Sequence, residues 1–137
     1  MHPFGERIRA VPMIMVMGTI FFLSNQSGDT IDLGRIPGLD KVAHMTIYAV
    51  LAATVIFAYR QPYKNKFPLQ VCCTTIIVCL LYGLSDEFHQ SFVPGRFVSG
   101  ADVLADVIGA VLASALWFFQ IKRRREKDKP AGPVPMV

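Results

Sequence analysis

Long apolar stretches alternate with short polar clusters along the chain. A helix that crosses the hydrocarbon core of a bilayer needs roughly 20 mostly apolar residues, and four stretches approach or reach that length. The predicted spans cover about residues 8–24, 41–59, 69–88 and 101–121. Strands are not expected, because the apolar runs are too long and do not alternate in polarity. We therefore predict an all-α membrane protein whose four-transmembrane-helix bundle lies within residues 1–121.

The first stretch also has the basic start and apolar run of a signal peptide. No small-x-small cleavage site follows it, so we expect it to remain as a span. Residues 122–137 are basic and then proline-rich, and we expect a cytoplasmic tail with a disordered end.

Composition agrees with a membrane protein. Hydrophobic residues make up 53% of the chain and charged residues 18%, whereas soluble domains carry about a quarter charged residues. Cys72, Cys73 and Cys79 lie inside one apolar run without a CxxC spacing, so we expect neither a disulfide nor a metal role for them.

Charge predicts the orientation of the spans. Eleven of the fourteen Lys and Arg residues fall in the N-terminal tail, the loop between the second and third spans, and the C-terminal tail. The positive-inside rule then places both termini in the cytoplasm. The net charge of +4 arises at these sites, so it predicts topology and no nucleic-acid partner. Seven of the ten acids fall on the opposite, outer side, and topology does not explain them.

Helical spacing organises the polar residues of the outer side. Residues four apart share one stripe of a helix, and each of the last three spans carries such a stripe near its outer end. The candidate binding residues are Asp40, Lys41, His44, Tyr48, Tyr82, Asp86, Glu87, His89, Gln90, Arg96, Asp102 and Asp106.

Because burying a charge is costly, we expect the polar stripes of the three spans to face one another. An Asp inside the bilayer costs on the order of 2.5–3.5 kcal/mol on insertion scales, so it should face a partner or water. Asp106 lies inside the fourth apolar run, and its candidate partners are Arg96, Lys41, His44 and His89.

Structural explanations stay open for several of these residues. Asp40 could cap the second span, and Ser99 with Asp102 fits a capping box before the fourth. Lys41 could extend to the interface, and Arg96 could clamp its loop to the acids. Packing or interfacial roles are equally open for Tyr48, Tyr82 and His89.

No motif predicts a metal or a cofactor. His44, Asp86, His89 and Asp106 offer nitrogen and oxygen ligands, but no H-E-x-x-H occurs. A G-x-S-x-G elbow and a Gly-rich phosphate loop are also absent from the sequence. We therefore predict no metal site and no cofactor.

Three blocks of the sequence resemble signatures of VanZ-like membrane proteins. Residues 40–51, DKVAHMTIYAVL, resemble the pattern D-K-x-x-H-x-x-x-Y-x-x-L. Residues 86–96, DEFHQSFVPGR, resemble D-E-x-x-Q-x-F-x-P-x-R, and residues 102–109 resemble D-x-x-x-N-x-x-G. The blocks occur in the expected order from the second span to the fourth. One position departs from the family, which usually has Asn where this chain has Asp106.

The resemblance implies a multi-pass protein of the bacterial cytoplasmic (inner) membrane, linked to the cell envelope. The namesake of the family is associated with resistance to teicoplanin, a glycopeptide antibiotic that binds cell-wall precursors.

Three functions are compatible with the outer cluster. The favoured one is binding of a lipid headgroup or cell-envelope intermediate through Arg96, Lys41 and His44. The second is an intramembrane enzyme that acts on a lipid-linked cell-wall intermediate by acid-base chemistry. Its candidate catalytic residues are Asp86, Glu87, Asp106 and His44, with Asp102 as a further acid. The third is a structural partner of a membrane complex, and the oligomeric state stays open.

Overall fold

The structure is a computed structural model that describes residues 8–27 and 38–128. In this part of the chain there are five helices and no strand. The helices are α2 (Val11–Ser24), α3 (Leu39–Ala58), α4 (Gln61–Lys66), α5 (Pro68–Gln90) and α6 (Gly100–Lys127). The predicted all-α fold is confirmed for the described residues.

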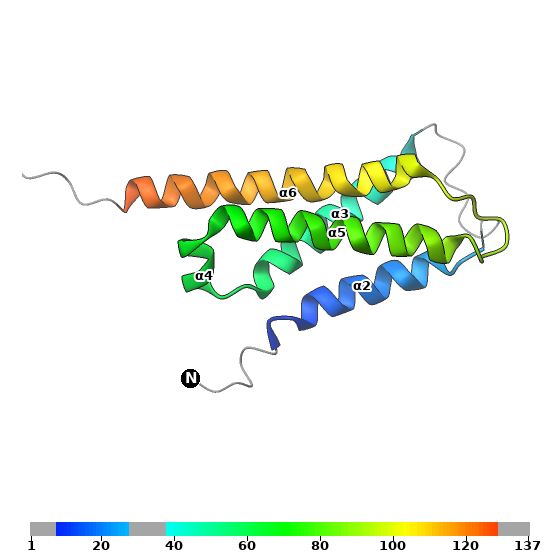
Figure 1. Cartoon of the computed structure of the whole chain (residues 1–137), viewed down its shortest axis with the longest axis horizontal. Coiled ribbons are helices and arrows are strands. Elements are labelled where there is room, and N and C mark those ends of the chain that lie inside the picture. The colour runs from blue at the N-terminus through cyan, green and yellow to red at the C-terminus, as the bar shows by residue number, and fades with distance from the viewer. Residues whose placement is uncertain (1–7, 28–37, 129–137) are drawn as a thin grey trace, which may run out of the picture.

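The four longer helices run roughly along one common axis, and α4 is a short connector between α3 and α5 (Figure 1). The most extensive interface joins α3 to α6, and the next joins α5 to α6. α2 packs against α3 and α5. The bundle is therefore built on the contact of α6 with α3 and α5, with α2 added on their other side.

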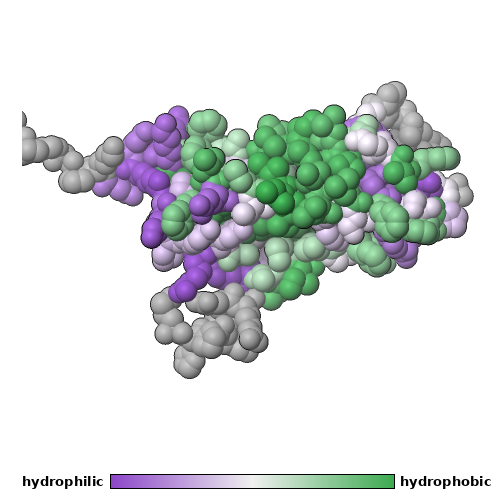
Figure 2. All heavy atoms as spheres, in the orientation of Figure 1, coloured by the Kyte–Doolittle hydropathy of each residue, from purple (hydrophilic) through white to green (hydrophobic). Residues whose placement is uncertain are grey.

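Of the helices in the described residues, three are long and apolar enough to cross a membrane: α3, α5 and α6. α2 is also apolar, but its 14 residues span only about 21 Å at 1.5 Å per residue, less than the hydrocarbon core. Apolar side chains cover the middle of the surface, and hydrophilic ones gather toward its two ends (Figure 2). The molecule is a multi-pass membrane protein. A fourth crossing by α2 and the cytoplasmic position of both termini stay predictions.

The helix bounds follow local sequence signals. Gly38 precedes α3 with a φ of +83°, which a residue with a side chain rarely adopts. Pro68 begins α5, where its missing N–H costs nothing. α6 continues to Lys127, beyond the expected end of the span near residue 121, and α4 occupies part of a segment expected to be a loop.

Small residues let the helices approach closely at one level of the bundle. A Cβ added at Gly109 of α6 would lie 2.1 Å from the carbonyl oxygen of Met45 in α3. A Cβ added at Gly83 of α5 would lie 2.8 Å from Oδ2 of Asp106. Next to these glycines, Tyr48 and Ala110 are completely buried. The close approach places the first turns of α3 and α6 and the last turns of α5 within reach of one another.

Candidate functional site

Ionisable side chains gather at one end of the bundle, which we call the acidic end. Here α2 and α5 finish and α3 and α6 begin. Among the described residues, the charged groups and histidines of the acidic end are Asp40, Lys41, His44, Asp86, Glu87, His89, Arg96, Asp102 and Asp106. Four of its five acids are buried, namely Asp86, Glu87, Asp102 and Asp106. Burial of this many carboxyl groups requires partners, and the contacts between helices supply most of them.

The most buried of these acids pairs with a histidine across the α3–α6 interface. Nδ1 of His44 lies 3.0 Å from Oδ1 of Asp106, whose exposed fraction is 1%. Oδ2 of Asp106 has no hydrogen-bond partner among the described residues and faces Gly83. Of the four candidate partners predicted for Asp106, His44 is the one that contacts it in the structure.

Lys41 joins the first turns of α3 and α6. Its ammonium group contacts Oδ1 of Asp102 and lies 2.9 Å from Oδ2 of Asp40. The capping box considered for Ser99 and Asp102 does not form, because the Ser99 side chain makes no cap hydrogen bond. Asp102 acts as a partner of Lys41 instead.

Glu87 lies deep in the same end, with an exposed fraction of 3%. Its Oε2 accepts a hydrogen bond of 2.7 Å from the backbone N–H of Ser99, which fixes the start of α6 against α5. Its Oε1 is buried without a hydrogen-bond partner in residues 8–27 and 38–128.

A second set of contacts ties α5 to α2. Nε2 of Gln90 donates to Oδ2 of Asp86 at 3.1 Å and to Oγ of Ser24 at 3.4 Å. Tyr82 donates its hydroxyl to the Met17 carbonyl at 2.6 Å. Part of the polar stripe on α5 therefore holds α2 in place.

Arg96 also binds α2. It donates from Nε to the carbonyl of Gln26 at 3.0 Å and from Nη2 to the carbonyl of Leu23 at 3.1 Å. Leu23 lies in the last turn of α2 and Gln26 follows the helix, where backbone acceptors lack partners within the helix and attract cations. Arg96 therefore ties its loop to backbone carbonyls, and the described contacts do not include the clamp to the acids that the sequence left open. A direct pairing of Arg96 with Asp106 is absent from the described contacts.

His89 does not join the pair formed by His44 and Asp106. Its ring packs on Phe21 of α2, with 4.7 Å between the ring centroids, and its Nε2 is buried without a hydrogen-bond partner among the described residues. His89 contributes to a smaller pocket with Phe21, Tyr82 and Phe92. The prediction that His89 could pair with Asp106 was wrong, because its side chain faces α2 and not α6.

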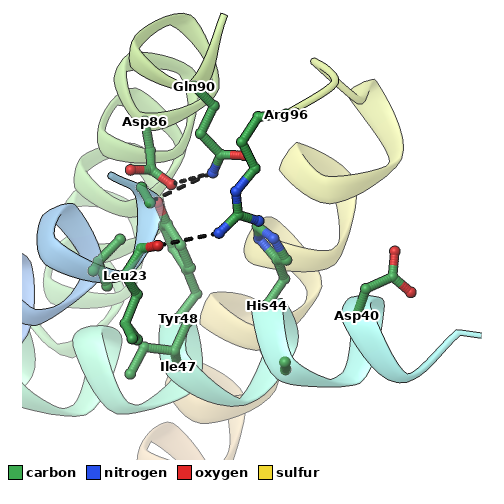
Figure 3. A pocket seen from close by; sticks show the side chains of 11 residues that line it. Leu23, Asp40, His44, Ile47, Tyr48, Asp86, Gln90 and Arg96 are labelled. Atoms are coloured by element: carbon green, nitrogen blue, oxygen red, sulfur yellow. Dashed lines mark hydrogen bonds between the residues drawn. The ribbon is translucent and has the colours of Figure 1, made fainter. Parts of the chain in front are cut away.

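A pocket of about 350 Å³ opens at the acidic end between α2, α3, α5 and the loop before α6 (Figure 3). One part of its wall is apolar and comes from Ile20, Leu23, Ala43 and Ile47. The other part is polar. Its polar lining residues are Ser24, Asp40, His44, Tyr48, Asp86, Gln90 and Arg96. Tyr48 is completely buried at its base, and its hydroxyl has no partner among the described residues.

The candidate residues thus separate into three places. Six of them line the pocket: Asp40, His44, Tyr48, Asp86, Gln90 and Arg96. Lys41, Glu87, Asp102 and Asp106 pack between α3, α5 and α6, and Tyr82 and His89 face α2. The sequence did not point to Ser24 or to the carbonyls of α2. The polar run of residues 24–26 after an apolar stretch was the available signal.

Comparison with known proteins identifies the family of the chain. A model of the VanZ/LLP1 family matches residues 9–121, most of the chain. The chain belongs to the VanZ/LLP1 family. The resemblance of its three sequence blocks to VanZ-like signatures is thereby confirmed.

A related protein is the "Uncharacterized protein C11E3.10" of Schizosaccharomyces pombe. It is 34% identical over 105 residues, which cover 74% of the present chain and 62% of the yeast protein. The chain thus spans less than two thirds of that relative. No solved structure matches the chain. The family and the apolar helices together support a VanZ-like multi-pass membrane protein.

Proposed function

We propose that this VanZ/LLP1 protein binds the phosphate-bearing headgroup of a membrane lipid in the pocket of the acidic end. The observation that carries the proposal is the composition of the pocket wall, which is apolar on one part and charged on the other. A lipid has the same division between acyl chain and headgroup. The apolar residues from α2 and α3 would contact the chain, and the polar residues would contact the headgroup.

Arg96 and His44 supply the donors for a phosphate group. Arg96 donates two of its five N–H groups to carbonyls of α2, and the guanidinium lines the pocket with the others. Guanidinium groups suit phosphate because they offer several donors in one plane. Asp86 and Gln90 offer acceptors and donors to hydroxyl or amine groups of the same ligand. Lys41 does not line the pocket, so the proposal differs here from the trio suggested by the sequence.

The yeast relative favours a ligand that occurs in many kinds of membrane. In a bacterial cytoplasmic membrane, the same chemical class includes lipid-linked cell-wall intermediates. Binding of such an intermediate would connect this chain with the cell envelope and with resistance to teicoplanin. We propose this connection as the bacterial form of the same binding activity.

Lipid retention by a pocket-filling variant tests the proposal. Ala43→Phe places a large ring at the pocket wall, whereas Val42→Phe adds a ring at a neighbouring exposed position outside the pocket lining. Each protein is purified in detergent, and its bound lipids are identified by mass spectrometry. We expect wild type and Val42→Phe to retain the same phospholipid, and Ala43→Phe to lose most of it.

Equal lipid retention by all three proteins would contradict binding in this pocket. Arg96→Lys adds a second comparison, since it keeps the positive charge and removes the planar set of donors. Weaker retention by Arg96→Lys, measured at a temperature at which both proteins stay folded, would place the phosphate beside Arg96.

Acid-base catalysis in the same pocket is a second candidate, favoured by the pair of His44 and Asp106. An imidazole that is oriented by a buried carboxylate and lines a pocket can act as a general base. The test is a change in mass of lipid-linked substrates incubated with the purified protein. Turnover that disappears in His44→Gln and persists in His89→Gln would support an enzyme, and no turnover of any substrate in the panel would count against it.

A further inference from the structure

Three potential metal ligands from three different helices converge beside the pocket. They are His44 of α3, Glu87 of α5 and Asp102 of α6, and one donor atom of each lies within 4.8 Å of the other two. Three atoms with these separations lie no more than about 2.8 Å from a common point, and nitrogen and oxygen ligands bind zinc at roughly 2.0–2.2 Å. Each donor therefore needs to move by less than about 1 Å to bind one ion.

His44 has a carboxylate partner of the kind that metal-binding histidines commonly have. Its Nδ1 is engaged by Oδ1 of Asp106 at 3.0 Å, which leaves Nε2 as the nitrogen open to a ligand. Histidines that bind metals commonly donate their other ring N–H to a carboxylate, which fixes the ring and makes it more basic. Asp106 is therefore placed to position His44.

Glu87 provides an independent sign of a missing cation. Its side chain is 97% buried, since the exposed fraction is 3%, and Oε1 has no hydrogen-bond partner in the described part of the chain. An unpaired oxygen of a buried carboxylate is costly, and native structures rarely leave one without water, a proton donor or an ion. Of the two carboxylate oxygens of Glu87, only Oε2 has a hydrogen-bond donor among the described residues, the backbone N–H of Ser99.

The charges around the three donors also favour a divalent ion. Glu87, Asp102 and Asp106 bring three carboxylates together, and Lys41 contributes one positive charge at Asp102. Lys41 also contacts Asp40, so carboxyl groups outnumber the cations that pair with them in this poorly solvated region, where unbalanced charge is strongly unfavourable. A bound divalent cation would offset this excess. Lys41 contacts Oδ1 of Asp102, so the other carboxylate oxygen stays available to the ion.

We propose that His44, Glu87 and Asp102 bind one divalent transition-metal ion, with Asp106 as the positioning residue of His44. One imidazole and two carboxylates suit ions such as Zn²⁺ and Mn²⁺. Three protein ligands leave coordination positions for water or for an oxygen of a ligand. His44 also lines the pocket, so the ion is placed at the edge of the pocket.

This inference departs from the prediction of no metal site. This set of ligands could not be recognised from the sequence, because the three residues come from three helices and no pair of them has the spacing of a known motif. The inference does not rest on lipid binding, because it uses the donor atoms and their charges alone. With the ion bound, Nε2 of His44 is a metal ligand, so the ion and not His44 would contact a phosphate.

Metal binding to the full-length protein in detergent tests the proposal. The protein is treated with EDTA, dialysed against Zn²⁺ or Mn²⁺, and analysed for metal by mass spectrometry. We expect wild type to bind about one ion per chain, and Glu87→Gln to bind at least about tenfold more weakly. The control His89→Gln removes another histidine of the same end and should bind as wild type does.

Glu87→Gln preserves the side-chain shape and keeps an oxygen that can accept from Ser99, which limits any effect on folding. Two further measurements test metal binding without relying on Glu87→Gln. Zn²⁺ should raise the unfolding temperature of wild type and of His89→Gln. Asp106→Asn should weaken binding by about 10–100-fold while the number of ions per chain stays the same. Absence of stoichiometric binding in wild type, or equal affinity in Glu87→Gln, would overturn the proposal.

Discussion

The two ends of the bundle carry opposite charge and place it differently. At the acidic end, four carboxyl side chains are buried between helices and most of them have defined partners. At the opposite end, which we call the basic end, the charged side chains of residues 122–127 in α6 are exposed. A charge in water costs little wherever it points, whereas a buried charge needs a partner in a defined place. Charged side chains with defined positions and partners are therefore expected at the acidic end.

The contrast separates two uses of charge in one small protein. The basic residues can set topology or contact anionic lipid through their number alone. The acidic end depends on individual atoms, and replacing a single residue there should disturb contacts between helices. Substitutions at matched positions of the two ends test this difference, and we order them by expected effect.

The largest effect should come from separating the helices that carry the acidic end. Gly109→Val would force its side chain into the Met45 carbonyl of α3, so we expect a loss of about 3 kcal/mol or more in the free energy of unfolding. Gly18→Val is the control, because nothing lies within 4 Å of a Cβ at Gly18. Thermal unfolding in detergent measures both variants. Similar unfolding temperatures for the two would contradict the close packing of α3 on α6.

Removal of one partner from a partly buried charge pair should have the next largest effect. Lys41→Met leaves Asp102 without its cation, and we expect a loss of about 2 kcal/mol. Lys66→Met changes an exposed lysine of the basic end and should cost less than about 0.5 kcal/mol. The double variant Lys41→Met/Asp102→Leu should recover part of the lost stability. If Lys41→Met is as mild as Lys66→Met, the two ends do not differ in the way described.

The contrast also explains what the sequence could predict. Helical spacing correctly indicated the helices, and it placed His44 and Asp106 on facing stripes that do meet. Spacing tells which residues share a face of one helix, but not which neighbouring helix that face contacts. His89 therefore looked equivalent to His44, although it packs on Phe21 of α2.

The contribution of α2 could not be predicted because much of it comes from the backbone. Arg96 binds the carbonyls of Leu23 and Gln26, which every residue possesses and no motif reveals. Glu87 was a candidate from its charge alone. Its buried, unpaired Oε1 becomes visible only when α3, α5 and α6 are assembled.

Loss of the contact between Arg96 and α2 should have a moderate effect. Arg96→Ala removes two hydrogen bonds to carbonyl groups at the end of α2, and we expect a loss of about 1–2 kcal/mol. Arg124→Ala, at an exposed position of the basic end, should change stability by less than about 0.5 kcal/mol. Thermal unfolding compares the two, and hydrogen exchange in α2 should increase only in Arg96→Ala. Unchanged exchange in α2 would show that Arg96 is not its clamp.

The smallest effect, with the opposite sign, is expected for Lys64, the exception at the basic end. Lys64 of α4 is buried, and this burial, followed by repulsion from Arg9, lowers the pKa of its ammonium group. The unfolded chain then binds a proton more tightly than the folded chain does. The stability contributed at Lys64 should therefore rise as the pH increases through the lowered pKa toward 10.5, the ordinary value.

Lys64→Met removes this charge while keeping an apolar side chain near the ring of Phe57. We expect the free energy of unfolding to increase by less than about 1 kcal/mol at neutral pH. The variant should also no longer become more stable between neutral and alkaline pH. Lys66→Met is the matched control, because Lys66 is exposed on the same short helix. A destabilised Lys64→Met would mean that this lysine has a specific partner, and the basic end would then resemble the acidic end in using a buried charge for geometry.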